Sequence, residues 1–484
     1  MNAFMFLSCF FFLILSLSAE EKEVLSLERY LHQVEELNPQ IQGTDVSIKG
    51  MEEKSLEMDM VYSPYVNAGY TFSLDKSGSS FGSSLPLEES KTHQWEASLT
   101  KKTSLGTQVS TGYSNMSGSF TLTEPAEITK DNTTDHFTGY EAKPFVRVEQ
   151  SLLRDFMSGL TQSGIDKSKA QVRAGQWRLV FQKQEILLKA RSAYWALSLA
   201  REVVTFRKAS LKRTEKLLEW TRKQVGLDLM DQSDLLQTEA AYEMRGLSLQ
   251  EAEENEKKAG RDFNRFLGKV GEKTGFRIEK IAGQIQNLDN PPELKALGTR
   301  ADLLAMKAEH QSYVFAERET KFRSMPEVSF IGEYSLNGRD TDSSETYEQV
   351  CNADKPVYTV GVTCTVPLDY KTLKKVREGF HKDLTASEEY LRSTENGIQN
   401  DWEQLLKDWK TVHSKIKLAE KIRVIQENRV ENEEKRFERG RTTTLQRIDA
   451  ENDLDDATLN LYQLIYQKLL IEAEAELYNT ASEF

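Results

Sequence analysis

Rows of apolar residues that repeat by heptads over very long stretches are the feature that most constrains the fold of this chain. They run over about residues 165–225, 233–267, 371–439 and 443–481. Apolar residues spaced alternately three and four apart form the seam of a coiled coil. At 1.5 Å per residue, the first and third helices would each be roughly 90–100 Å long, which no compact globule can hold. One row comprises Ala190, Leu197, Val204, Leu211, Leu218 and Val225, and another comprises Leu384, Leu391, Ile398, Leu405, Val412 and Ala419.

Two short segments with alternating apolar and polar residues predict β-strands. They read SPYVNAGYTFSL, residues 63–74, and MPEVSFIGEYSL, residues 325–336. Successive side chains of a strand point to opposite sides, so each segment has one apolar face and one polar face. Such a strand suits a sandwich with one wet face, or a membrane barrel with lipid outside and water inside. The apolar residues include Val66, Tyr70 and Phe72 in the first segment and Val328, Phe330 and Tyr334 in the second.

The two segments belong to a longer repeat. Pro64 and Pro326 are 262 residues apart, and the two segments align at that offset without a gap. Each is preceded by a helical run and followed by a polar loop, a second strand, a long helix, a turn with glycine and a shorter helix. This order predicts a tandem duplication, with a first repeat over residues 20–290 and a second over residues 291–484, which interleave in the fold. The second strands carry Val146 and Val148 in the first repeat and Val360 and Val362 in the second.

The first repeat contains an additional predicted hairpin, at about residues 95–113. The sequence leaves open whether this hairpin joins a sheet or lies in the loop that connects the two strands of the first repeat.

The first nineteen residues form a separate segment. They carry no charge, are mostly apolar, and end in small residues before the charged EEKE. This pattern is typical of a secretory signal peptide, predicted here as residues 1–19, although the usual basic start is missing. An uncleaved anchor is the alternative, but the apolar run is shorter than a membrane span needs. After residue 19 no run of about 20 apolar residues occurs, so any contact with a membrane would be made by strands.

Composition and motifs argue against several classes of function. The net charge of −13 argues against nucleic acid as a partner. The six histidines show no metal-ligand spacing, and there is no phosphate-binding loop or nucleophile motif. We therefore predict no catalytic, cofactor or metal site. In an exported protein, Cys351 and Cys364 could form a disulfide. Cys364 falls on the apolar side of a strand, however, so the sequence leaves open whether the two are bridged.

The order of elements resembles that of the TolC-like outer-membrane efflux protein family across nearly the whole chain after residue 19. Val225-Gly226-Leu227 resembles the VGL of that family's periplasmic helical turn, and DLLQTE, residues 234–239, resembles the segment after it. RGRTTTLQRIDAEND, residues 439–453, is similar to the family's G-x-x-x-x-x-D-x-L-D-A. Here Gln446 takes the place of the family's first aspartate, whereas Asp449 keeps the second.

The resemblance implies a mixed α and β membrane protein that assembles as a homotrimer. Each chain would give about four strands, so that three chains close a twelve-stranded β-barrel that continues into a long periplasmic α-helical coiled-coil barrel. Four strands alone cannot close a barrel, and open sheet edges are not tolerated in lipid. The protein would lie in the outer membrane of a Gram-negative bacterium and extend into the periplasm. The apolar residues named above on the four strands would face the outer-membrane lipid.

The function that the resemblance implies is a passive exit duct of a tripartite efflux or type I secretion system. A periplasmic adaptor would dock on the helical turns at Val225, Gly226, Leu227 and Gly440, where a glycine would let the chain reverse tightly. An inner-membrane transporter, proton-driven or of ABC type, would drive the cargo. Ordinary interhelical turns are the alternative interpretation of these residues.

Asp234, Gln446 and Asp449 would lie at the periplasmic entrance. There, threefold symmetry would bring like charges together and favour cations. Capping of a helix N-terminus is the alternative role for the aspartates.

Two other classes of function compete with the duct. One is a periplasmic coiled-coil scaffold without a pore, and the other is a porin-like outer-membrane protein that acts alone. The sequence does not distinguish drug, metal and protein as cargo.

Overall fold

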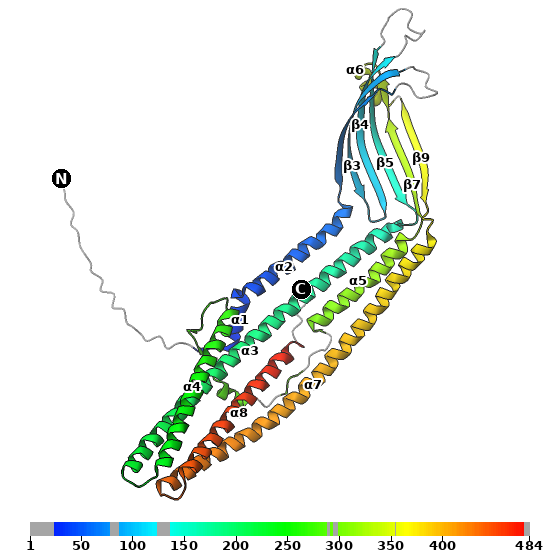
Figure 1. Ribbon diagram of the computed structural model, residues 1–484. Coiled ribbons are helices and arrows are strands. Elements are labelled where there is room, and N and C mark those ends of the chain that lie inside the picture. Colours follow the sequence, from blue (N-terminus) through cyan, green and yellow to red (C-terminus); the bar gives the residue numbers. More distant parts are fainter. Residues whose placement is uncertain are drawn as a thin grey trace, which may run out of the picture. The chain divides into compact units, whose positions relative to one another are not determined.

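The computed structural model describes residues 24–77, 87–122, 136–287, 291–293, 299–353 and 355–478. The predicted signal peptide lies outside these residues. The elements are β1 (Val24–Leu25), α1 (Leu27–Leu37), α2 (Pro39–Ser55), η1 (Leu56–Tyr62), β2 (Tyr65–Asp75), β3 (Leu87–Lys102), β4 (Thr107–Leu122), β5 (His136–Ser151), η3 (Phe156–Ser158), α3 (Gly159–Gly226), α4 (Gln232–Phe266), β6 (Arg277–Ile278), η4 (Ile281–Asn287), α5 (Ala301–Arg323), β7 (Glu327–Leu336), β8 (Gly338–Asp340), α6 (Ser343–Cys351), β9 (Pro356–Thr365), α7 (Tyr370–Glu438) and α8 (Thr444–Glu476) (Figure 1).

The chain divides into two compact units. The unit that we call the helical unit contains the chain up to Asp45, Phe181–Arg300 and the chain from Ile398 on. The unit that we call the sheet unit contains Val46–Val180 and Ala301–Gly397. Each unit takes segments from both predicted repeats, whose boundary at residue 290 stays a prediction.

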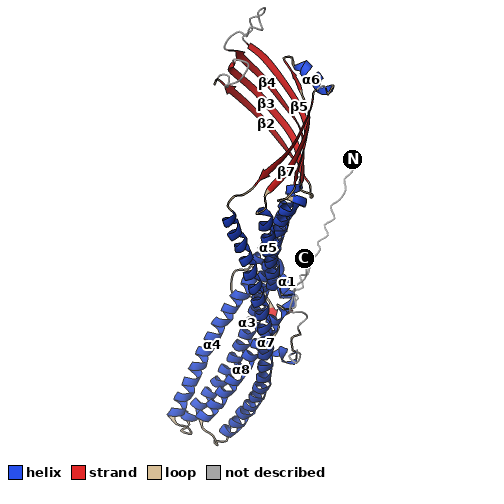
Figure 2. Ribbon diagram, turned by 90° about the vertical axis from the view of Figure 1, so that its right-hand side faces the viewer, coloured by secondary structure: helices blue, strands red, loops and turns tan. Residues whose placement is uncertain are grey.

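The sheet unit holds a single antiparallel sheet (Figure 2). Its strand order is β2-β3-β4-β5-β7-β9, and the short β8 pairs with β5 beyond β7. The prediction of about four strands per chain is therefore wrong. The additional hairpin supplies β3 and β4, which pair along their lengths with each other and with β2 and β5. Six of the sixteen residues of β4 are serine or glycine, and glycine is depleted in strands, so the alternating pattern is weak there.

The predicted long helices are confirmed as α3, α4, α7 and α8, and no end differs by more than six residues from the one expected. The apolar row of α7 is buried in the helical unit at its predicted positions from Ile398 to Ala419. None of the helices that the structure describes combines the length and the apolar character of a membrane span.

The row predicted for α3 is buried only in its first half, from Ala190 to Val204. Farther along, the buried positions shift by one residue, and Leu211 and Leu218 are only partly buried. The prediction is wrong there because the buried row is largely polar and binds charged groups of neighbouring helices. Its members are Ser210, Thr214, Leu217 and Thr221.

An aromatic cluster forms the core of the helical unit. Tyr30 of α1 stacks on Phe263 of α4 with 4.2 Å between ring centroids, and its hydroxyl donates to the carbonyl oxygen of Phe263 at 3.1 Å. The Tyr194 hydroxyl of α3 donates to the carbonyl oxygen of Leu25 at 2.7 Å and accepts from the amide of Glu279 at 3.0 Å. These bonds fix the parallel β1–β6 pair against the long helices.

Candidate functional site: the two-faced sheet and the helical turns

All ten residues predicted to face lipid lie on one face of the sheet. Directly paired residues of antiparallel strands share a face. Across the sheet, Val66 pairs with Leu99, Leu99 with Thr111, Thr111 with Val146, and Val146 with Tyr334. The side chain of Val66 is 72% exposed in the single chain. The ten are Val66, Tyr70 and Phe72 on β2, Val146 and Val148 on β5, Val328, Phe330 and Tyr334 on β7, and Val360 and Val362 on β9. Their contact with lipid stays a prediction.

The hairpin adds apolar side chains to the same face, which the sequence reasoning did not assign. They alternate along β3 and β4 as the predicted residues do along β2, so the period of two could have revealed them. Trp95 and Tyr113 contact each other across the two strands, with 5.2 Å between ring centroids. The added residues are Trp95, Ala97, Leu99, Val109 and Tyr113.

The opposite face of the sheet is polar and hollow. A cavity of 470 Å³ lies over it. Glu333 of β7 forms salt bridges with Lys143 at 2.8 Å and Arg147 at 2.6 Å, and Arg339 binds Glu141 at 2.8 Å. The other lining residues are largely hydroxyl and amide side chains, among them Asn67, Gln94, Ser98, Gln108 and Ser110. This face could border water.

The short helix α6 covers part of the apolar face near β8. The Asn115 side chain of β4 donates to the Tyr347 hydroxyl at 3.2 Å, and Ala142 beneath the helix is fully buried. Gly338 permits this packing, because a Cβ there would overlap the backbone of Thr346. The helix therefore covers Asn115 and Ala142 at this part of the sheet.

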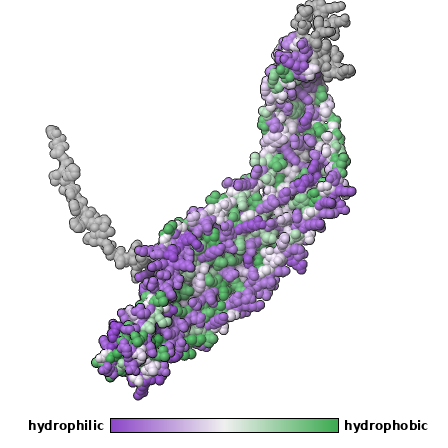
Figure 3. Space-filling view, in the orientation of Figure 1, coloured by the Kyte–Doolittle hydropathy of each residue, from purple (hydrophilic) through white to green (hydrophobic). Residues whose placement is uncertain are grey.

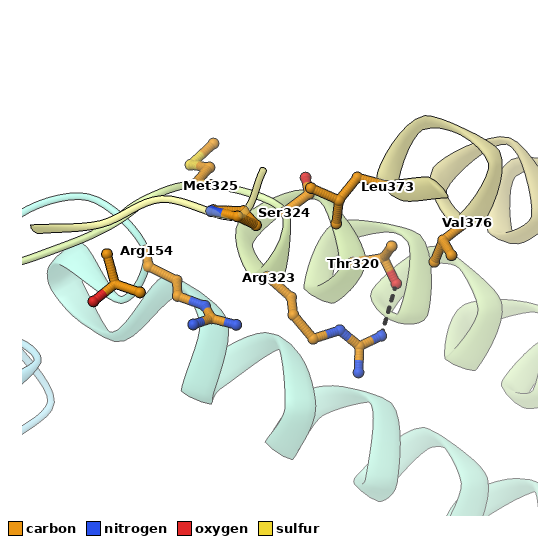
Figure 4. A pocket seen from close by; sticks show the side chains of 9 residues that line it. Arg154, Thr320, Arg323, Ser324, Met325, Leu373 and Val376 are labelled. Atoms are coloured by element: carbon orange, nitrogen blue, oxygen red, sulfur yellow. Dashed lines mark hydrogen bonds between the residues drawn. The ribbon is translucent and has the colours of Figure 1, made fainter. Parts of the chain in front are cut away.

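A smaller cavity of 270 Å³ lies where β5, β7 and β9 meet the ends of α5 and α7 (Figure 4). Arg154 and Arg323 both reach it, but each guanidinium binds an oxygen of the chain itself. Arg154 donates to Glu327 at 2.9 Å, and Arg323 donates to the Thr320 hydroxyl at 3.3 Å. We assign no ligand to this cavity.

The first helical turn reverses at Asp228 and not at Gly226. Asp228 has a left-handed φ of 56°, its amide donates to Val225, and the amide of Leu229 donates to Gln224. This is the hydrogen-bond pattern of a Schellman motif. Gly226 is the last residue of α3, with no positive φ, so the predicted role of its glycine in the reversal is wrong. A Cβ at Gly226 would meet no atom within 4 Å.

The second turn reverses at Gly440, as predicted. Gly440 has a φ of 65°, its amide donates to Phe437, and the amide of Arg441 donates to Arg436. Figures 1 and 2 show both turns at the same end of the helical unit.

Gln446 is bound within the second turn. Its amide donates to the Thr443 hydroxyl, and its side chain accepts from the Thr443 amide, each at 3.3 Å, which is a capping box. The Thr442 hydroxyl also donates to the Gln446 side chain, at 2.6 Å. Asp449 is exposed about one helical turn farther along α8, and Asp234 lies in the first turn of α4. Their role at an entrance stays a prediction.

A buried cluster of charged residues, which the sequence reasoning missed, joins α3, α4 and α8. Arg245 of α4 lies 3.0 Å from Glu451 of α8. Asp455, one turn farther along α8, accepts from the Ser210 hydroxyl at 2.7 Å and lies 3.4 Å from Arg207. Buried charges require such partners. The cluster ties the hairpin of the first turn to the helix that follows the second turn.

Among the residues that the structure describes, no three or more His, Cys, Asp and Glu side chains are placed to hold a metal ion. Cys351 and Cys364 are both exposed and unbridged.

Comparisons with solved structures show the same fold in outer-membrane channels. The structure of CusC, described as forming a transmembrane channel, matches with a TM-score of 0.68 and 12% identity, over 95% of this chain and 93% of that chain. VceC of Vibrio cholerae matches with a TM-score of 0.65 and 13% identity, over 94% and 97%. The CmeC channel of Campylobacter jejuni matches with a TM-score of 0.64 and 10% identity, over 95% and 87%.

Sequence comparison gives a match to one family model. No curated protein matches the chain significantly. Residues 294–481, which contain the second helical turn and the strands β7 and β9, match the family model described as outer membrane efflux protein. Residues 294–481 therefore resemble the outer membrane efflux protein family, and the fold over nearly the whole chain is that of solved outer-membrane channels.

Proposed function

We propose that this chain forms, as a homotrimer, the passive exit duct of a tripartite efflux or type I secretion system. The observation that carries the proposal is the sheet, which has an apolar face, a polar face and two open edges. β2 and β9 stand at the ends of the strand order, so each has one edge without a partner in the described chain. Unpaired backbone groups in lipid cost several kcal/mol each, so the edges need partners.

Copies of the chain can supply these partners. Neighbouring strands are antiparallel throughout, so β2 and β9 run in opposite directions. β9 of one copy can then pair with β2 of the next in the antiparallel sense, and a ring of copies closes with no edge left. In such a ring the polar face lines the pore and the apolar face contacts outer-membrane lipid.

The two turns support docking of a periplasmic adaptor. Gly226 has neither a backbone conformation nor a close neighbour that requires glycine, so its missing side chain would serve a partner's approach. Leu227 and Leu229 beside it are 66% and 68% exposed. In Figure 3, apolar side chains are interspersed with polar ones at this end of the helical unit. The adaptor would connect the duct to an inner-membrane transporter, proton-driven or of ABC type.

The periplasmic entrance would carry one main ring of charge, made by Asp449. Gln446 is neutral and its side chain binds Thr442 and Thr443, so it would add no charge to the ring. Asp234, in the first turn of α4 on the neighbouring helical hairpin, would add to the negative electrostatic potential of this ring. Rings of carboxylates favour cations in a pore.

Reconstitution of the full-length protein into a planar bilayer tests this function. We expect a trimer that conducts ions, and export from cells that stops when the adaptor is deleted. A stable assembly without conductance would favour the periplasmic scaffold, whereas export that persists without any adaptor would favour a porin that acts alone.

A further inference from the structure

We propose that the β3–β4 hairpin is part of the membrane wall of the pore, so that three chains close a barrel of eighteen strands instead of twelve. Six long strands lie side by side in each chain, which gives eighteen in three copies. The inference rests on the proposed duct function and concerns the width of its exit. The wider lumen would pass hydrophilic cargo that a twelve-stranded lumen excludes.

The hairpin occupies the middle of the sheet and not its margin. β3 pairs with β2 along Tyr65–Asp75, and β4 pairs with β5 along Thr107–Thr121. Both outer edges of the hairpin are therefore hydrogen-bonded to neighbouring strands. A hairpin that folded over the mouth of a narrower barrel would leave β2 and β5 to pair directly, which this register does not allow.

Insertion of two strands leaves the closure of the ring unchanged. β2 and β5 run in opposite directions with or without the hairpin between them, because two antiparallel strands restore the alternation. β9 of one copy and β2 of the next can thus pair in the same sense in either barrel.

The hairpin has the two faces that a membrane wall requires. Leu99 lies opposite Val66 and Val109 lies opposite Val148, so the apolar face of the hairpin continues that of its neighbours. On the polar face the Thr100 and Ser110 hydroxyls bind each other at 3.0 Å. A span needs about 9–11 residues, so strands of sixteen residues also extend past the lipid. The apolar side chains of β3 and β4 lie toward their shared turn, and His93, Lys91, Ser117 and Ser119 occupy the same face farther away.

The turn between β3 and β4 is fixed to the base of the sheet. Gly106 has a left-handed φ of 78° and lies against the backbone of Asp155. Lys102 binds the Asp155 carboxylate at 2.7 Å and the Thr161 hydroxyl at 2.8 Å. The Ser158 hydroxyl donates to the carbonyl oxygen of Thr103 at 3.2 Å. The turn of the hairpin is therefore held against the segment between β5 and α3, as expected if β3 and β4 are strands of the barrel wall.

Strand number sets the width of the lumen. Barrel diameter grows roughly linearly with the number of strands, so eighteen strands give a lumen about 1.5 times as wide as twelve, and barrels of 16–18 strands leave an aqueous channel. The polar face of the hairpin adds hydroxyls and amides, with Glu96 as its carboxylate in the cavity lining. The added wall would therefore be hydrophilic and weakly charged.

Polymer exclusion from the extracellular side tests the width. Polyethylene glycols of graded size are added on that side only, so that a narrow periplasmic entrance does not set the limit. We compare the full-length channel with a variant that lacks residues 87–122, which returns β2 to β5. We expect the radius of the largest polymer that enters to be about 1.5-fold larger for the full-length channel. Equal limits would overturn the inference.

Thiol labelling gives a second measurement on the intact channel, in case the deletion variant does not assemble. Cys351 and Cys364 are first replaced by serine. Glu96→Cys, exposed on the polar face, should react with a water-soluble maleimide, and Leu99→Cys should react only with a lipid-soluble one. Equal labelling of both positions by the water-soluble reagent would place the hairpin outside the wall and overturn the inference. Absence of any conductance from the full-length protein would instead contradict the duct function itself.

Discussion

Arg245 of α4 and Glu451 of α8 form an ion pair of 3.0 Å whose side chains are 6% and 3% exposed. The pair joins the hairpin that carries the first helical turn to the helix that follows the second. A buried charge that loses its partner destabilises a protein by about 3–5 kcal/mol, whereas an exposed pair contributes about 0.2–1 kcal/mol. The relative position of the two turns therefore depends on a pair that is strong only while both members are present.

We expect Glu451→Gln to destabilise the helical unit by up to about 3–5 kcal/mol, because it removes the nearer of the two carboxylates beside the buried Arg245 and leaves only Asp455, at 3.9 Å. Thermal and denaturant unfolding, followed by circular dichroism, would measure the loss. Glu427→Gln is the matched control, since Glu427 pairs with Arg423 at 3.0 Å on the exposed surface of α7. Equal effects of the two substitutions would contradict the buried role of the pair.

Glycine at the two turns should respond to substitution in opposite ways. Gly226→Ala should keep or raise stability, because position 226 is helical and open and alanine favours a helix by about 1 kcal/mol. Gly440→Ala should lower stability by about 1–2 kcal/mol, because position 440 has a left-handed φ. Thermal unfolding separates the two variants.

Export by the same variants tests the docking proposal. Gly226→Ala should impair export in spite of its intact fold, since the new methyl group would meet the adaptor. Normal export by a stable Gly226→Ala trimer would remove this position from the docking surface.

Charge at the entrance should depend on Asp449. We expect Asp449→Ala to raise the leak of bulky antibiotics and to lower single-channel selectivity for cations. Gln446→Ala is the control, because it removes a helix cap and no charge. Unchanged selectivity of the Asp449→Ala channel in a bilayer recording would exclude Asp449 from the gate.

Glu472 of α8 should give the helical unit a pH-dependent stability. Burial raises the pKa of this carboxyl, although Trp409 donates to it at 3.1 Å and Lys468 lies 3.8 Å away. A raised pKa in the folded state adds stability that is fully present below the ordinary value of 4.5 and is lost as the pH rises through the folded pKa. Glu472→Gln keeps an acceptor for Trp409 and should flatten this part of the pH profile of the melting temperature. Parallel profiles for variant and wild type would contradict the assignment.

The helices and the two-faced strands were predictable because their signal is periodic. The row from Ile398 to Ala419 and the alternation from Val66 to Phe72 each repeat over several turns or pleats. Hydrogen bonds between residues far apart in the chain produce no periodic pattern in the sequence. The left-handed position lies at Asp228, two residues after Gly226, because Gly226 is still part of the helix.

Residues whose role is set by distant partners were missed for the same physical reason. Glu451 and Asp455 look like members of a solvated helix face, and only the packing of α3 and α4 shows that they are buried. The β3–β4 hairpin was detected but not placed, since β4 is rich in serine and glycine and its pairing depends on β2 and β5.

Cross-linking between β2 and β9 tests most directly the claim that open sheet edges close copies of the chain into one barrel. Asn67→Cys on β2 and cysteines placed in turn at Thr359, Gly361 and Thr363 on β9 all lie on the polar face, after Cys351 and Cys364 are replaced by serine. Within one chain the two strands stand at opposite ends of the sheet, too far apart for a disulfide. We predict that oxidation of at least one pair gives a ladder that ends at a covalent trimer. Monomers alone, or a ladder that ends at a dimer, would contradict the account.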